Sequence, residues 1–118
     1  TFALVSLGAA LFTIISQIAF AEFSGKAGFD PSRIASQIVV GIGFLGAGAI
    51  MLQESKIRGL TTAAGLWVTA AIGMSVGYKM FTVAIAATFL TLIIFVCLWI
   101  IEKKFIGENA KSWHGESD

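Results

Sequence analysis

The sequence has 118 residues, of which 57% are hydrophobic and only 13% are charged, and its mean hydropathy is +0.88. Because an ordinary soluble domain is about a quarter charged, this composition argues against the soluble classes and predicts an integral membrane protein. The net charge of +1 excludes the strongly basic character of nucleic-acid-binding proteins, and the single cysteine cannot form an intramolecular disulfide.

Charged residues form short islands that separate four uncharged stretches. Each stretch is close to the roughly 20 residues that cross a hydrocarbon core, and none has the polar stripe that would favour a soluble helical bundle. We therefore predict an all-α polytopic membrane helix bundle over residues 1–104, followed by a short polar cytoplasmic tail over 105–118. Because the chain starts inside an apolar stretch and without methionine, we expect further residues upstream. The four predicted transmembrane helices are about 1–21, 31–52, 59–77 and 80–101.

Two glutamines flank the loop between the first two predicted helices, at similar distances from it: Gln17 and Gln37. Amides at the same depth of a membrane can bond across helices, which stabilises by about 0.6–2 kcal/mol, so we expect these two to hydrogen-bond each other. The alternative is a polar vestibule at the mouth of the bundle. Its other members would be Glu22, Asp30 and Arg33.

The second helix is expected to start at Asp30-Pro31, because Asp accepts hydrogen bonds from free first-turn amides and Pro fits the first helical position. Its segment GIGFLG, residues 41–46, matches G-x-G-x-x-G, but a dinucleotide site would need a preceding strand and an acidic residue for the ribose. We interpret the glycines as packing residues on two faces of a central helix. Gly43 and Gly46 share one face, and Gly41 and Gly48 the other.

Residues 53–58 are expected to form a short polar turn before the third helix. The simpler interpretation is a solvated turn. The alternative is a site for an anion or a lipid headgroup at the helix N-terminus. That site would consist of Arg58, Thr61 and Thr62.

The third helix has a small residue at every fourth position, a pattern that permits close packing against the second helix or against a second subunit. Trp67 lies near the middle of this helix, where it would fill the core or face a wet cavity that binds its indole N–H. The small residues of the pattern are Gly65, Thr69, Gly73 and Gly77.

A tight turn at Lys79 is expected to lead into the fourth helix, which ends near Trp99, a residue type suited to the membrane interface. The 53–58 turn, the end of the fourth helix and the tail would share one side of the membrane, which carries five basic residues against three on the other side. The positive-inside rule places that side in the cytoplasm.

The four uncharged stretches contain no Asp, Glu, Lys, Arg or His. Proton relays usually include buried ionisable groups, so a proton-coupled transporter is disfavoured, although a pore lined by hydroxyls and backbone carbonyls stays open. No nucleophile–base pair and no metal-ligand spacing is present in the sequence. We therefore expect no enzymatic activity, no catalytic residue, no metal site and no cofactor.

Three segments resemble the MgtC/SapB family: residues 3–10 (ALVSLGAA), 30–48 (DPSRIASQIVVGIGFLGAG) and 58–67 (RGLTTAAGLW). The resemblance covers about residues 3–101. It implies a bacterial inner-membrane protein with about five transmembrane helices, hence a fifth helix upstream of the four, and no catalytic residues to carry over. This sequence matches neither the family's first helix nor the soluble C-terminal domain of some members.

The resemblance also implies a function in adaptation to magnesium limitation or envelope stress, linked in some members to virulence. Such a protein would regulate other membrane proteins, with the ATP synthase one candidate, and it could form a homodimer. The alternatives are a channel or transporter for a small ion such as Mg²⁺, with oxygen ligands at the mouth of the bundle, and a structural membrane subunit. A polar cavity among the first three helices would favour transport, and a packed bundle with an exposed small-residue face would favour interaction.

Overall fold

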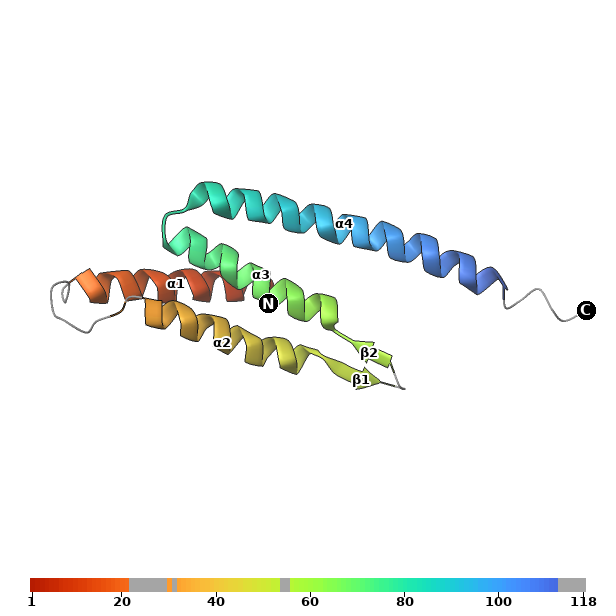
Figure 1. The fold of residues 1–118 in the computed structure, drawn as a ribbon, viewed down its shortest axis with the longest axis horizontal. Helices are drawn as coiled ribbons and strands as arrows, with labels where there is room; N and C mark the ends of the chain where they lie inside the picture. Colours follow the sequence, from red (N-terminus) through yellow and green to blue (C-terminus); the bar gives the residue numbers. More distant parts are fainter. Residues whose placement is uncertain (22–29, 31, 54–55, 113–118) are drawn as a thin grey trace, which may run out of the picture. The chain divides into compact units, whose positions relative to one another are not determined.

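The computed structural model describes residues 1–21, 30, 32–53 and 56–112, which contain four helices and a short hairpin (Figure 1). All four helices are long and apolar enough to cross a membrane. The predicted all-α membrane bundle with four transmembrane helices is thus confirmed, and the chain is a multi-pass membrane protein. The elements are α1 Phe2–Ala21, α2 Ser32–Ala49, β1 Met51–Gln53, β2 Lys56–Arg58, α3 Leu60–Gly77 and α4 Phe81–Ser112.

Two helix ends differ from the prediction. Helix α2 ends at Ala49, three residues before the expected 52, because Met51–Gln53 leaves the helix as a strand and pairs with Lys56–Arg58. Helix α4 continues to Ser112, beyond the expected 101. A helix satisfies its own backbone hydrogen bonds, so it can pass from an apolar into a polar sequence without losing them. Residues 113–118 lie outside the described part.

The turn between α3 and α4 is the tight one expected at Lys79. This residue has a left-handed backbone with φ of 61°. The amides of Tyr78, Lys79 and Met80 bond back to carbonyls of the last turns of α3. These bonds satisfy helix-end carbonyls that would otherwise lack a partner.

The chain divides into two compact units, Thr1–Ala87 and a second unit that begins at Thr88 and contains most of α4. The second unit is a single helix over its described residues. Near its polar end, the Lys103 ammonium lies 5.1 Å from the centroid of the Trp99 ring. A cation over an aromatic face gains electrostatic attraction, and both residue types suit a membrane interface.

In the first unit, α3 is the central helix. It packs along both α1 and α2, whereas α1 and α2 contact each other much less. The prediction that the second helix is central is therefore wrong. The reason lies in two glycines of α3: a Cβ at Gly73 would overlap the Ser6 carbonyl oxygen, and a Cβ at Gly77 would lie 2.6 Å from that of Thr13. The backbones of α1 and α3 can approach this closely only because these side chains are absent.

The buried core of the first unit is small and includes Ala9, Ile42, Leu66 and Ala70. Thr13 is also buried, and its hydroxyl donates a 2.8 Å hydrogen bond to the Ala9 carbonyl, so this buried hydroxyl has a partner. Most large apolar side chains are exposed, up to 81% for Phe44. Soluble monomers rarely expose so much apolar surface, whereas lipid tails cover it in a bilayer.

Candidate functional site

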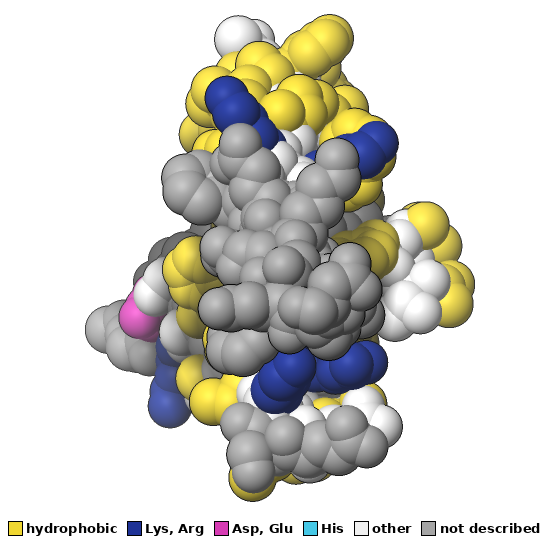
Figure 2. All heavy atoms as spheres, turned by 90° about the vertical axis from the view of Figure 1, so that its right-hand side faces the viewer, with side chains coloured by type: hydrophobic (Ala, Val, Ile, Leu, Met, Phe, Trp, Pro, Cys, Tyr) yellow, Lys and Arg dark blue, Asp and Glu magenta, His cyan; other side chains and the backbone are white. Residues whose placement is uncertain are grey.

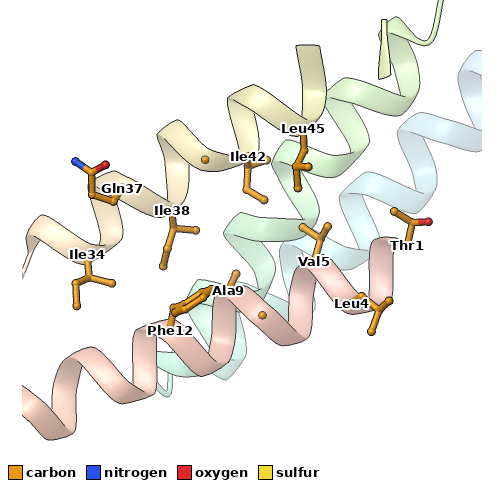
Figure 3. Close-up of a pocket in the computed structure, with 12 residues that line it drawn as sticks. Thr1, Leu4, Val5, Ala9, Phe12, Ile34, Gln37, Ile38, Ile42 and Leu45 are labelled. Atoms are coloured by element: carbon orange, nitrogen blue, oxygen red, sulfur yellow. The ribbon is translucent and has the colours of Figure 1, made fainter. Parts of the chain in front are cut away.

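An apolar groove of about 570 Å³ runs between α1 and α2 (Figure 3). It exists because both helices pack on α3 and little on each other. Val5 and Ala9 of α1 lie opposite Ile38 and Ile42 of α2. Within the described part of the chain, the side chains that bring polar atoms to its lining are Thr1 and Gln37.

The predicted hydrogen bond between Gln17 and Gln37 is not formed. The Gln17 amide nitrogen donates instead to the Gly77 carbonyl oxygen at 3.0 Å. Gly77 is the last residue of α3, and carbonyls at a helix end have no partner within the helix. Gln37 is exposed on α2, and its amide points away from α1 (Figure 3). Sequence distances from the loop carry no information on the direction in which each amide faces.

The described residues of the predicted vestibule make different contacts and do not form one polar site. The Asp30 carboxylate accepts hydrogen bonds from the Ser32 backbone N–H at 2.9 Å and from the Ser32 hydroxyl at 2.7 Å, so it caps the N-terminus of α2 as expected. Arg33 is exposed one turn into that helix. Glu22 lies outside the described residues. Among those described, Gln17 is bonded to α3 and does not share a polar network with Asp30 or Arg33.

The hydrogen bonds from Ser32 also hold the pKa of the exposed Asp30 carboxyl below its ordinary value of 3.8. The bond from the Ser32 hydroxyl is the largest cause and the bond from its backbone amide is next. Desolvation opposes these two bonds more weakly by raising the pKa, and the charge of Arg33 adds the smallest contribution, a lowering. Both bonds favour the charged form of the carboxyl, because only the carboxylate accepts them fully.

The glycines of the predicted packing pattern fall into two groups. Gly73 and Gly77 abut α1, which is neither of the partners expected for the third helix, and Gly46 lies against Ala63 of α3 with a Cβ distance of 3.7 Å. Gly65 is buried and Thr69 is half-buried in α3. The second group is exposed on α2, with no atom of another element within 4 Å of an added Cβ. These residues are Gly41, Gly43 and Gly48.

The predicted anion site around Arg58 has a different setting from the one expected. Arg58 belongs to strand β2, and Thr61 and Thr62 are exposed in the first turn of α3. The N-cap residue before this helix is Gly59, whose φ of 89° is left-handed, and it makes no side-chain hydrogen bond to the first amides of the helix. The short polar turn expected at 53–58 is thus the end of a β-hairpin.

Trp67 does not fill the core. Its side chain is 54% exposed and lines a pocket of about 260 Å³ beside Met74 of α3 and Tyr78, the residue that follows α3. Met74 and Tyr78 lie seven and eleven positions after Trp67, spacings that place all three on one side of the helix. The tryptophan therefore faces the surroundings of the first unit at mid-helix.

Comparison with known proteins identifies the group to which the chain belongs. The model of the MgtC family matches residues 1–104. The chain belongs to the MgtC family. It is 48% identical over 111 residues to "Putative magnesium transporter YhiD" of Escherichia coli K12, covering 92% of this chain and 52% of that protein.

Other relatives carry the family's name. "Protein MgtC" of Salmonella typhimurium LT2 is 48% identical over 78% of this chain and 37% of its own length. "Protein MgtC" of Brucella abortus is 45% identical over 72% of this chain and 33% of its own length. The chain thus spans about half or less of the relatives it matches. No solved structure matches it.

In this member of the MgtC family, sequence reasoning missed the α1–α2 groove and the hairpin. The groove had no sequence signal, because it depends on which helix occupies the centre. The hairpin had a weak one: Ile57 stands between Lys56 and Arg58, an alternation typical of a half-exposed strand.

Proposed function

We propose that this chain is part of a bacterial inner-membrane protein that supports adaptation to magnesium limitation or envelope stress by binding and regulating other membrane proteins. Membership of the MgtC family supports this proposal. The name of the YhiD relative supports the part of it that concerns magnesium. The proposed partners are another membrane protein, with the ATP synthase a candidate, or a second copy of the chain. The function needs no catalytic step and no cofactor.

The observation that carries this proposal is the exposed small-residue face of α2, formed by Gly41 and Gly48, which lie nearly in line along the helix. These glycines have no neighbour from another element within 4 Å of an added Cβ. In a membrane, helices associate through van der Waals contact and close backbone approach, for which glycine surfaces are suited. Such a surface supports an interaction with a further helix, supplied by a partner protein.

A second candidate function, transport of Mg²⁺, is favoured by the name of the YhiD relative. Mg²⁺ requires oxygen ligands and gives up its water reluctantly. Thr1 and Gln37 are the polar residues in the described lining of the groove between α1 and α2, and the Gln37 amide points away from α1. We therefore rank transport below interaction.

The proposal is tested by complementation in the bacterium that carries the gene. A deletion strain is grown at limiting Mg²⁺ with the full-length protein, with Gly48→Leu, or with Ala86→Leu as a control. Ala86→Leu introduces the same side chain at an exposed position of α4. We expect Gly48→Leu to lose growth and its in-cell crosslinks to membrane partners while reaching normal membrane levels. Normal growth and crosslinking of both variants would contradict the proposal.

A further inference from the structure

The hairpin between α2 and α3 has two chemically different faces. Its strands are antiparallel and pair Met51 with Arg58, Leu52 with Ile57, and Gln53 with Lys56. Residues directly opposite in such a ladder point to the same face, and successive residues alternate. Leu52 and Ile57 therefore share one face, which is purely apolar. Met51, Gln53 and the two cations share the other.

Neither face is covered within the described part of the chain. Leu52 is 77% exposed and Ile57 is 61% exposed. Lys56 and Arg58 are exposed as well. The space-filling view from this side shows both hydrophobic and Lys or Arg side chains at the molecular surface (Figure 2). Exposure of the apolar Leu52–Ile57 pair to bulk water is unfavourable, because apolar surface gains free energy when it leaves water.

The position of the hairpin places it at the edge of a bilayer. It follows α2 after one residue and precedes α3 by one residue (Figure 1). Each of these helices has 18 residues, about 27 Å at 1.5 Å per residue, against a hydrocarbon core of about 30 Å. Each helix therefore spans most of the hydrocarbon core, and the hairpin that joins the two helices lies at the boundary of that core.

The hairpin is also held firmly to the end of α2. Gly59 follows β2 with a φ of 89°, and a Cβ at this position would overlap the Ala49 carbonyl oxygen and lie 2.9 Å from the Ala49 carbonyl carbon. Only glycine combines this backbone conformation with so close an approach. The contact fixes the hairpin to the last residue of α2 and limits its freedom to turn over.

We propose that this hairpin is an interfacial anchor whose Leu52–Ile57 face enters the outer hydrocarbon of the bilayer while Lys56 and Arg58 bind the phosphates of anionic phospholipids. The apolar pair is covered by acyl chains, and the cations meet the negative headgroups that concentrate in the cytoplasmic leaflet. The positive-inside orientation puts the hairpin at that leaflet. The inference is independent of whether the protein regulates a partner or conducts an ion.

The first test measures the depth of each face. Single cysteines at Leu52, Ile57, Gln53 and Lys56 are introduced into the full-length protein with its native cysteines replaced, labelled with an environment-sensitive fluorophore and reconstituted in vesicles. We expect brominated acyl chains to quench labels at Leu52 and Ile57 strongly and labels at Gln53 and Lys56 weakly. Equal quenching at the two faces, or none at either, would overturn the anchor and indicate a protein partner or plain solvation.

The second test measures lipid selectivity with spin-labelled phosphatidylglycerol and phosphatidylcholine. The wild-type protein should prefer phosphatidylglycerol, and the K56Q/R58Q variant should lose that preference. The matched control, R33Q/K79Q, removes two positive charges at the other ends of the helices and should keep it. An unchanged preference in K56Q/R58Q would contradict headgroup binding. Loss of the preference on adding millimolar inorganic phosphate, at constant ionic strength, would reassign the cations to a soluble anion.

Discussion

The amide of Gln17 donates a 3.0 Å hydrogen bond to the carbonyl of Gly77, sixty residues away in the chain. The bond joins the last turns of α1 to the end of α3, one turn from the place where Gly77 abuts Thr13. It satisfies a helix-end carbonyl that an apolar environment would leave without a partner. The pair therefore fixes how α1 and α3 are aligned along their length.

Substitution Gln17→Leu should lower the stability of the folded protein. It removes the donor to the Gly77 carbonyl, and interhelical bonds of this kind contribute about 0.6–2 kcal/mol. The measurement is the free energy of unfolding in mixed detergent micelles. Gln37→Leu is the matched control, because Gln37 is exposed and its amide points away from α1. Equal losses in the two variants would contradict the assigned bond.

Substitution Gly73→Ala should separate α1 from α3, whereas Gly43→Ala should have little effect. The added methyl at position 73 overlaps the Ser6 backbone, which cannot move aside as a side chain can. Overpacking of a tight contact costs about 1–3 kcal/mol. At Gly43 the methyl meets no neighbouring element. Thermal unfolding in detergent checks both variants, and a similar melting temperature for the two would show that α1 and α3 do not pack as described.

The pKa of Asp30 should rise towards its ordinary value in Ser32→Ala, because the Ser32 hydroxyl is the largest cause of its lowering. Carbon-detected NMR titration of the carboxyl measures the change. Ser36→Ala is the control, since that hydroxyl donates to the Arg33 carbonyl and not to Asp30. An Asp30 pKa that is the same in Ser32→Ala and wild type would contradict the hydrogen bond assigned between the Ser32 hydroxyl and Asp30.

The same lowering gives the cap a pH dependence of known sign. A carboxyl that is more acidic in the folded chain stabilises it above the unfolded pKa, and this contribution is lost as pH falls through the folded pKa. Acidification below about pH 3.8 should therefore weaken wild type more than Ser32→Ala. The reverse order would contradict the assignment.

Trp67 should be quenched by lipids brominated deep in the acyl chain. Its ring is 54% exposed at the middle of α3, where a bilayer supplies acyl chains around it. Replacing the other two tryptophans of this chain, Trp99 and Trp113, by Phe isolates its emission. Emission that iodide quenches and brominated lipid does not would instead place Trp67 beside water.

Features that depend on local sequence were predictable. The four spans follow from runs of apolar residues, the start of α2 follows from the capping chemistry of Asp30, and the turn at Lys79 follows from the charge between two apolar runs. None of these requires knowledge of which helix lies beside which.

The arrangement of the helices was not predictable in the same way. Gly43 and Gly73 look alike in sequence, since glycine shows where a close approach is possible and not which helix makes it. Only Gly73 is covered within the chain. Likewise, Leu52 extends an apolar run, which favours a longer second helix when the sequence is considered alone. In the structure, Leu52 pairs with Ile57 in an antiparallel ladder and belongs to a strand. The candidate site could not be predicted for the same reason, because the groove and the exposed glycines both result from the central position of α3.

Whether the protein acts by contact or by conduction is decided by Mg²⁺ flux into proteoliposomes that contain the full-length protein. A Mg²⁺-sensitive dye inside the vesicles reports entry, with empty vesicles and Gln37→Leu as references and with insertion checked by protease protection. We expect entry at the rate of empty vesicles, because the described groove is apolar apart from Gln37 and Thr1. Faster entry that Gln37→Leu abolishes would contradict the interaction proposal and make the groove an ion pathway.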